Sequence, residues 1–409
     1  MATKYIKRHM EELFLEASDF FKAVLLTGPR QVGKTFMLMH LKQNNRTYVS
    51  LDDDVVCNIA RTDPALFFQM YKPPILIDEV QKAPQLFNQI KNICDQTDEK
   101  GLFWLTGSQK YKLLKNASET LTGRIGILSL YGFSTSEVLN IKNTTVDIDY
   151  EGFSKKQLDS RIQNVNQIYE RIFQGGYPQV IGASPKMRKA YYDSYLDTYL
   201  MRDVMEDTGI TDVAKFKLFI RACASMVGNL VNFANLSNQI GISQPTAKTW
   251  LGILQSLGIV FLLESFSNNN LNSLVRTPKL YFWDTGFAAY LCGWQDSETL
   301  CLGPSSGAFF ENYVISEIQK SRIFNGSQSS FSYYRDKHGN EIDLILQEHQ
   351  TVTPIEIKRT ASPEVSMAKT FHLLKVNEPL KLGTGVIICN QPKVLKLADH
   401  IISIPAGLV

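Results

Sequence analysis

This chain lacks the long apolar runs and the cysteine and histidine clusters that mark several classes of protein. No apolar run approaches the ~18 residues of a membrane-spanning helix, and no charged N-terminal region precedes an apolar segment of the signal-peptide kind. The six cysteines are scattered without a C-x-x-C pair, and the six histidines are equally dispersed. We therefore expect reduced thiols, no cysteine-bound zinc, and a cytoplasmic protein without a membrane partner.

Charge and length set few limits on function. Charged residues make up 20% of the chain, and the net charge of +3 neither demands nor excludes a nucleic-acid partner. A length of 409 residues leads us to expect roughly two to four domains with separate cores. No internal repeat or low-complexity segment appears, so the whole chain is expected to be globular.

Residues 28–35 read Gly-Pro-Arg-Gln-Val-Gly-Lys-Thr, a complete G-x-x-x-x-G-K-[ST] phosphate-binding loop. An apolar run at 23–27 leads in as a buried strand, and residues 35–41 lead out at helical spacing. The glycines let backbone N–H groups curl around phosphate oxygens, the lysine reaches the β- and γ-phosphates, and the threonine ligates Mg²⁺. We predict that ATP and Mg²⁺ bind at Gly28, Pro29, Arg30, Gln31, Val32, Gly33, Lys34 and Thr35.

A second motif agrees with the first. Residues 75–79 read Ile-Leu-Ile-Asp-Glu, an apolar strand that ends in two acids, the form of a Walker B segment. Asp78 is expected to hold Mg²⁺ through water, and Glu79 to polarise the attacking water. Acids at a strand end are ordinary surface caps elsewhere, but here they follow a phosphate-binding loop with one strand, 47–51, between.

Two polar positions farther on carry open alternatives. Ser108, with Thr106 or Gln109 nearby, ends the apolar strand that begins at residue 102. It could contact the γ-phosphate or the lytic water, as the sensor residue of AAA+ ATPases does. The alternative is that it merely starts a polar loop. Arg124 precedes an apolar strand at 125–130 and acts either as an arginine finger toward a neighbouring subunit or as a surface cap of a helix end. An arginine finger that acts in trans implies a homo-oligomer. The alternative is an ATPase that works as a monomer, and the sequence leaves both open.

Several motifs together resemble a prokaryotic family of predicted AAA+ ATPases that carry an uncharacterised C-terminal domain. The resemblance covers almost the whole chain and implies a P-loop ATPase core over 1–150 with a helical lid over 151–227. The lid interval also holds Arg202-Asp203, a charged pair with no role beyond the resemblance. The matching segments are 28–35, 76–81, 105–108, 121–124, 175–178, 199–204, 279–286 and 310–314.

Residues 152–227 show no strand pattern, and we expect helices at 154–169, 187–205 and 211–227. Residues 228–272 then predict a winged helix, with helices at 233–240 and 244–257, an N-cap at Ser243, a strand at 259–264 and a wing tip at 268–270. The exposed face of the second helix offers Gln244, Lys248 and Thr249 to DNA. The set contains no arginine, and such modules also serve as protein–protein spacers, so both uses stay open.

The C-terminal segment, 273–409, carries a second group of charged residues. We expect a helix at 307–320, strands at 331–335, 341–346 and 354–358, a helix near 363–374 and a strand at 385–389. Period-two alternation puts the acids of the second strand on one face, and Glu356 and Lys358 of the third strand on one face.

This element order with a D…E-x-K pattern resembles the PD-(D/E)xK nuclease superfamily. The resemblance implies that Glu311, Asp343 and Glu356 hold Mg²⁺ or Mn²⁺ at a scissile phosphate and that Lys358 is catalytic. The alternative is a degenerate nuclease core that only binds a partner. Two functions therefore stand: an ATPase coupled to a metal-dependent DNA nuclease, or a non-cleaving ATP switch whose C-terminal domain binds nucleic acid or protein.

Overall fold

The structure, a computed structural model, describes residues 5–108, 120–142, 164–201, 204–205, 210, 212–266 and 277–409. Contacts divide the chain into two compact units, of which the first comprises residues 1–132 and 256–259, and the second 133–255 and 260–409. Four predictions lie wholly or mainly outside the described residues: Gln109, the helix at 154–169, the Arg202-Asp203 pair and the wing tip at 268–270.

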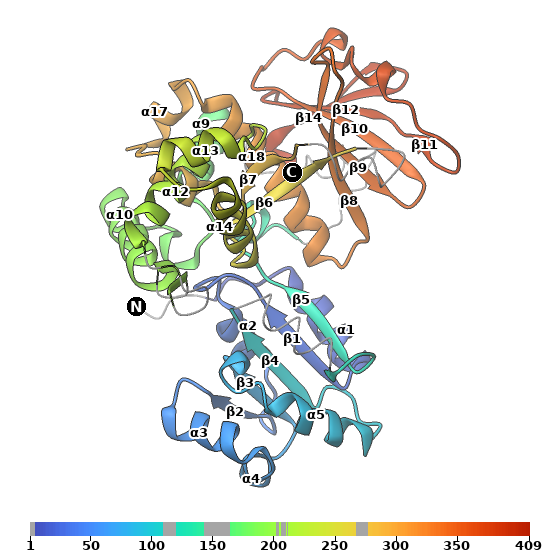
Figure 1. Cartoon of the computed structure of the whole chain (residues 1–409). Helices are drawn as coiled ribbons and strands as arrows, with labels where there is room; N and C mark the ends of the chain where they lie inside the picture. The colour runs from blue at the N-terminus through green and yellow to red at the C-terminus, as the bar shows by residue number, and fades with distance from the viewer. Residues whose placement is uncertain are drawn as a thin grey trace. The chain divides into compact units, whose positions relative to one another are not determined.

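The first unit is built on one parallel sheet with the strand order β2-β3-β4-β1-β5 (Figure 1). Every neighbouring pair is parallel, so all five carboxyl ends meet at one edge of the sheet. The strands are β1 Ala23–Thr27, β2 Thr47–Ser50, β3 Ile75–Asp78, β4 Phe103–Gly107 and β5 Ile125–Ser129. All five strands that the sequence predicted in this region are confirmed.

Helices cover both faces of this sheet. On one face, Leu25, Ile77 and Leu105 join a core with buried residues of α3, α4 and α5. On the other face, Trp104 packs edge-on against Phe14 of α1 and donates a hydrogen bond to Ser18. The three central strands β1, β3 and β4 are therefore buried along their whole length, because apolar side chains cover both faces of the sheet. The helices are α1 Met10–Phe20, α2 Lys34–Leu41, α3 Asp54–Thr62, α4 Pro64–Met70 and α5 Leu86–Asp95.

The second unit begins with a helical part. Helices α12, α13 and α14 form a cluster in which Trp250 packs against Phe216 and Phe219, with ring centroids 5.2 and 5.5 Å apart. Ser243 accepts a hydrogen bond from the backbone of Thr246 at 3.2 Å, so the predicted N-cap of α14 is confirmed. The helices here are α7 Thr135–Val138, α9 Val165–Gln174, α10 Pro185–Ser194 with a π-helical turn at Tyr195–Leu200, α12 Val213–Ser225, α13 Phe233–Ile240 and α14 Gln244–Ser256.

The rest of the second unit centres on a mixed sheet with the strand order β13-β14-β12-β10-β9-β8-β6-β7, to which β11 adds beside β10 (Figure 1). The expected helix at 307–320 and the expected strands are confirmed with small shifts of their ends. The elements are β6 Val260–Ser265, β7 Lys279–Phe282, α16 Thr285–Leu291, α17 Ser297–Leu302, α18 Ser306–Phe324, β8 Ser329–Arg335, β9 Glu341–Glu348, β10 Thr351–Ile357, β11 Lys381–Leu382, β12 Gly385–Cys389, β13 Leu395–Ala398 and β14 Ile401–Pro405.

Two features of this unit differ from expectation. The predicted helix near 363–374 is wrong: the segment forms short 3-10 turns at Val365–Ala368 and Phe371–Leu373. The buried residues Ala368, Phe371 and Leu374 recur at intervals of three, the period of 3-10 turns, so two short turns bury them without a continuous α-helix. In addition, β6 pairs with β8, so one sheet crosses the expected boundary at residue 272. The four-part division of the chain stays a prediction.

Candidate functional site

The phosphate-binding loop joins β1 to α2 and has the backbone that its glycines predict. Gly33 is left-handed, with φ of 92°, at the N-terminus of α2. Gly28 has φ of 144°, and a Cβ there would lie 1.9 Å from the carbonyl oxygen of Leu130. Lys34 donates to the carbonyls of Gly28 and Pro29 at 2.9 and 2.8 Å, which holds its ammonium over the loop. Both glycines are therefore sterically required.

The carboxyl edge of the sheet gathers oxygen ligands beside this loop. Thr35 donates to a carboxylate oxygen of Asp78 at 2.8 Å, and Thr106 at the end of β4 donates to the same oxygen. Tyr48 of β2 donates to the other oxygen at 3.3 Å. Burial, and then the charge of Asp78, raise the pKa of the Tyr48 phenol, so it remains a donor. The predicted partners Thr35 and Asp78 thus meet with hydroxyl and carboxylate oxygens, which suit Mg²⁺.

Glu79 and Ser108 also come together, and a third residue joins them. Glu79 is left-handed, with φ of 56°, and Ser108 donates to its carboxylate at 3.5 Å. The side-chain amide of Gln81 also donates to that carboxylate and lies 3.5 Å from Ser108. The other amide atom, Oε1 of Gln81, is buried and accepts no hydrogen bond from the residues that the structure describes. Gln81 was not among the predicted site residues, although it ends the motif at 76–81 and follows Glu79 by two residues.

Arg124 lies at the opposite edge of the sheet. Its carbonyl accepts from the backbone of Ala23, the first residue of β1, while the phosphate-binding loop follows the last residue of that strand. Five residues of strand span roughly 16 Å at about 3.3 Å each, so Arg124 does not serve the nucleotide of its own chain. Its side chain is one-third exposed and pairs with Asp95 at 2.5 Å.

The glycine motif at 175–178 has a structural explanation in the second unit. Asp284 accepts hydrogen bonds from the backbone of Gly176 at 2.6 Å and from Tyr192 at 3.0 Å, and it caps α16 through the backbone of Phe287. A Cβ at Gly175 would lie 2.5 Å from the Asp284 carboxylate. The motifs at 175–178 and 279–286 therefore pack against each other, and this packing leaves no room for a Cβ at Gly175.

The three residues predicted to contact DNA are all exposed on α14. Gln244 begins the helix, Thr249 donates to the carbonyl of Pro245 at 3.1 Å, and the Lys248 ammonium lies 5.6 Å from the ring of Phe233. Ala247, Trp250, Leu251 and Leu254 are buried on the opposite face. The face is open to solvent, and whether DNA binds there stays a prediction.

In the C-terminal sheet, Asp343 and Glu356 lie on the neighbouring strands β9 and β10 and share one ammonium. Lys358 Nζ lies 3.2 Å from Oδ2 of Asp343 and 2.5 Å from Oε1 of Glu356. Oδ2 of Asp343 also accepts from the backbone of Ile357 at 2.8 Å. Oε2 of Glu356 is buried and has no hydrogen-bond partner within the described part of the chain. The structure therefore brings three of the four predicted nuclease-like residues together.

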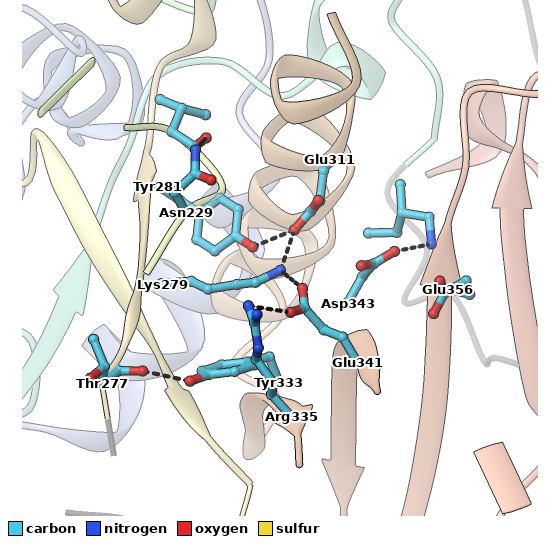
Figure 2. Close-up of polar contacts among 12 residues, drawn as sticks. Asn229, Thr277, Lys279, Tyr281, Glu311, Tyr333, Arg335, Glu341, Asp343 and Glu356 are labelled. Atoms are coloured by element: carbon cyan, nitrogen blue, oxygen red, sulfur yellow. Dashed lines mark hydrogen bonds and ion pairs between the residues drawn. The ribbon is translucent and has the colours of Figure 1, made fainter. Parts of the chain in front are cut away.

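The fourth predicted residue, Glu311 on α18, belongs to a separate pair of carboxylates. Figure 2 shows the ammonium of Lys279 between Glu311 and Glu341, at 3.0 and 2.5 Å from their oxygens. The hydroxyl of Tyr281 donates to the same oxygen of Glu311 at 2.5 Å. Lys279 was not among the predicted site residues, although it begins the motif at 279–286. Its charge in an otherwise apolar strand was the signal.

Electrostatics tie the two pairs together. Burial first, and then the charge of Asp343, raise the pKa of Glu311 to about 7 and that of Glu356 to about 7. The nearby lysines lower both values in part. Burial lowers the pKa of Lys279, but the charges of the surrounding carboxylates outweigh it and keep the side chain protonated. The four carboxylates of the cluster, Glu311, Glu341, Asp343 and Glu356, thus face one buried ammonium, that of Lys279, and two partly exposed cations, Lys358 and Arg335.

The donor set suits a divalent cation only in part. Carboxylate oxygens are the ligands that Mg²⁺ and Mn²⁺ prefer, and Glu356 has an oxygen to which no described group donates a hydrogen bond. Among the residues that the structure describes, however, no three His, Cys, Asp or Glu side chains converge as a metal site. Two carboxylates, Asp343 and Glu356, fit one ion that completes its shell with water or phosphate oxygens.

Family models match three parts of the chain. Residues 20–139 match the model described as AAA domain, which contains the phosphate-binding loop, Asp78, Glu79, Ser108 and Arg124. Residues 165–298 and 306–408 match two models described as domains of unknown function, DUF8612 and DUF4143. The last interval contains Glu311, Asp343, Glu356 and Lys358.

Similar proteins occur in several bacteria. Uncharacterized proteins of Mycobacterium bovis and Mycobacterium tuberculosis are each 28% identical over 94% of this chain and 80% of their own length. An uncharacterized protein of Haemophilus influenzae is 23% identical over 68% of this chain and 70% of its own.

Among solved structures, a variant of Thermotoga maritima RuvB is 18% identical with a TM-score of 0.31, covering 64% of this chain and 89% of its own. A DNA replication initiation factor is 13% identical with a TM-score of 0.25, covering 61% and 90%. These TM-scores are too low to establish a shared fold.

None of the helices that the structure describes combines the length and the apolar character that a membrane-spanning helix needs. An AAA domain implies ATP binding, usually with Mg²⁺, and ATPase activity. The chain therefore combines an AAA ATPase domain near its N-terminus with a C-terminal domain of unknown function, DUF4143.

Proposed function

We propose that this protein is an ATPase whose nucleotide cycle controls a nuclease-like C-terminal domain acting on DNA. The observation that carries the ATPase half is the meeting of Thr35, Asp78 and Glu79 at the carboxyl edge of the first sheet. The phosphate-binding loop supplies backbone N–H groups and the Lys34 ammonium for the phosphates. Mg²⁺, when bound through Thr35 and Asp78, would neutralise charge on the β- and γ-phosphates.

The remaining residues of this edge act on the attacking water. Glu79 accepts its proton or orients it, and the contacts from Ser108 and Gln81 hold the Glu79 carboxylate in place. Arg124 reaches the nucleotide of a neighbouring chain, since it lies at the far edge of its own sheet. This assignment makes the active form a homo-oligomer.

The DNA-binding half of the proposal rests on α12, α13 and α14 followed by the antiparallel strands β6 and β7. This order is that of a winged helix, in which the last helix enters the major groove. The exposed residues Gln244, Lys248 and Thr249 on α14 offer an amide, an ammonium and a hydroxyl to DNA.

A PD-(D/E)xK-like interpretation of the C-terminal domain is supported by helix α18, strands β8, β9 and β10, and the joint placement of three residues. Asp343 and Glu356 would hold one divalent ion, and such an ion would polarise a scissile phosphate and its attacking water. Lys358, released from the two carboxylates, would orient that water. Its side chain is 42% exposed, so it has room to move.

One observation favours a second function, a non-cleaving switch. Lys358 already bridges Asp343 and Glu356 and neutralises part of their charge. In that state the domain needs no metal ion, and it could serve ATP-dependent binding of DNA or protein without cutting.

Incubation of the full chain with plasmid and linear DNA, with ATP and either Mg²⁺ or Mn²⁺, separates the two functions. Cleavage that requires the metal and is lost in Asp343→Asn supports the nuclease. Retention of DNA in a mobility-shift assay without cleavage, in the wild type as in Asp343→Asn, supports the switch. If the protein neither cleaves DNA nor retains it, the DNA part of the proposal is wrong. ATP hydrolysis measured in the same mixtures, with Lys34→Ala as the inactive control, reports on the first unit separately.

A further inference from the structure

Lys279 is the most deeply buried charge of the C-terminal cluster. Its side chain is 4% exposed and its ammonium touches carboxylates of α18 and β9, elements that are distant from β7 in sequence. The backbone of Lys279 is fixed as well, because it pairs with Leu263 of β6 and forms an isolated bridge with Leu230. Strand register and ion pairs therefore hold the ammonium in one place.

A buried charge costs free energy unless groups of opposite charge contact it, and two carboxylates contact the ammonium of Lys279. Glu311 and Glu341 both contact Lys279, and Tyr281 donates to Glu311 beside it. Two carboxylates that converge on one point are also what a divalent ion requires. The ammonium of Lys279 occupies that point, as Figure 2 shows.

The two lysines of the cluster differ in whether they can leave. The side chain of Lys358 is 42% exposed, so its ammonium can turn into solvent and give up Asp343 and Glu356. The side chain of Lys279, at 4%, has no such path. Moreover, the carboxylate with a buried oxygen that accepts no hydrogen bond from the described residues is Glu356, on the Lys358 side of the cluster. A coordination position for a metal ion can thus open at one pair of carboxylates, when Lys358 turns away, and not at the other.

We infer that Lys279 is a built-in cation that takes the place of a second metal ion, so that the cluster accepts one divalent ion, at Asp343 and Glu356. In this arrangement Glu311 positions Lys279 and is not a metal ligand. The inference rests on the proposed metal site of the C-terminal domain, and it assigns that site a one-metal mechanism with a fixed ammonium beside it.

The test counts bound Mn²⁺ in the full chain without nucleotide, by titration with electron paramagnetic resonance and by native mass spectrometry. Four proteins are compared: the wild type, Asp343→Asn, Lys279→Gln and Lys279→Arg. Circular dichroism and thermal unfolding, with and without Mn²⁺, establish that each variant is folded. Removing the Lys279 charge leaves Glu311 with its hydrogen bond from Tyr281, and Glu341 with the partly exposed Arg335 as its remaining cation. Two carboxylates that have lost their shared ammonium favour binding of another cation between them.

We expect one Mn²⁺ in the wild type, none in Asp343→Asn, two in Lys279→Gln and one in Lys279→Arg. The second ion should raise the Tm of Lys279→Gln beyond the rise seen in the wild type. Two ions in the wild type, or one ion in a folded Lys279→Gln protein, would overturn the role of Lys279 and leave the metal site standing. No ion in the wild type would overturn the metal site itself, and the inference with it. If Lys279→Gln does not fold, the variant Glu311→Gln tests the inference instead. One bound ion in Glu311→Gln, and none when Asp343→Asn is added to it, supports the inference. Loss of the ion in Glu311→Gln alone contradicts it.

Discussion

Replacing Glu356 with glutamine should change the stability of the protein in a pH-dependent way. We expect the free energy of unfolding of the variant, minus that of the wild type, to be larger at pH 8 than at pH 5. Burial and the charge of Asp343 raise the pKa of Glu356 from 4.5 to about 7 in the folded chain. Between these values the folded state keeps a proton that the unfolded state has lost. The stabilisation by this proton is complete below about pH 4.5 and disappears as the pH rises through 7.

The size of the effect follows from the shift. Each pKa unit corresponds to about 1.4 kcal/mol, so the carboxyl of Glu356 makes unfolding easier by at most about 3 kcal/mol at pH 8 compared with acid. Glutamine has the same shape and no charge, and it removes this dependence. Coupling to Asp343 and to Lys358 divides the effect among several groups, so about 1–3 kcal/mol is the expected range.

The assay is thermal unfolding of the full chain in EDTA at pH 5 and pH 8. At roughly 1–2 °C per kcal/mol for a chain of this length, the Tm of Glu356→Gln minus that of the wild type should be higher at pH 8 than at pH 5 by about 1–5 °C. Glu298→Gln, an exposed site on α17, is the matched control and should show no such difference. An equal Tm difference at both pH values would contradict the claim that burial and the charge of Asp343 raise the pKa of Glu356.

Three other predictions concern the two units. Mixing Arg124→Ala with Lys34→Ala should restore part of the ATPase activity, because each chain supplies one intact half-site; normal hydrolysis by Arg124→Ala alone would remove the arginine finger. Gln81→Ala should lower kcat about tenfold or more with little change in KM for ATP, since a misplaced Glu79 costs turnover and not binding, and Gln81→Glu should move the acid limb of the kcat–pH profile upward; an unmoved profile would assign Gln81 a structural role. Gly175→Ala should lower the Tm of the chain, because its Cβ would meet the Asp284 carboxylate at 2.5 Å; an unchanged Tm would contradict the packing of the two motifs against each other.

Local signals in the sequence were enough to anticipate that Thr35 and Asp78 lie close together. The loop at 28–35 and the acids at 78 and 79 each follow an apolar strand, and parallel strands bring their carboxyl ends to one edge. The contact between Thr35 and Asp78 is thus a consequence of strand order, and it could be anticipated without any side-chain detail. The same holds for α14, whose buried face and N-cap follow from helical spacing.

The partners of Glu311 could not be anticipated in this way. Lys279 and Glu311 meet because β7 joins the sheet beside β6, a pairing that no local pattern encodes. Asp284 likewise reaches Gly176 across a long stretch of chain. The sequence predicts a helix near 363–374, whereas the buried residues Ala368, Phe371 and Leu374 recur at intervals of three, a spacing that depends on packing in the core.

The ATPase assignment is tested most directly by comparing ATP binding and ATP turnover in Glu79→Gln and the wild type at saturating Mg²⁺. Glutamine keeps the shape of the residue and its place beside Ser108 and removes the charge that polarises water. The account predicts equal binding of ATP and hydrolysis at least ~100-fold slower, the usual scale for loss of a catalytic acid or base. Turnover by Glu79→Gln at the wild-type rate would contradict it.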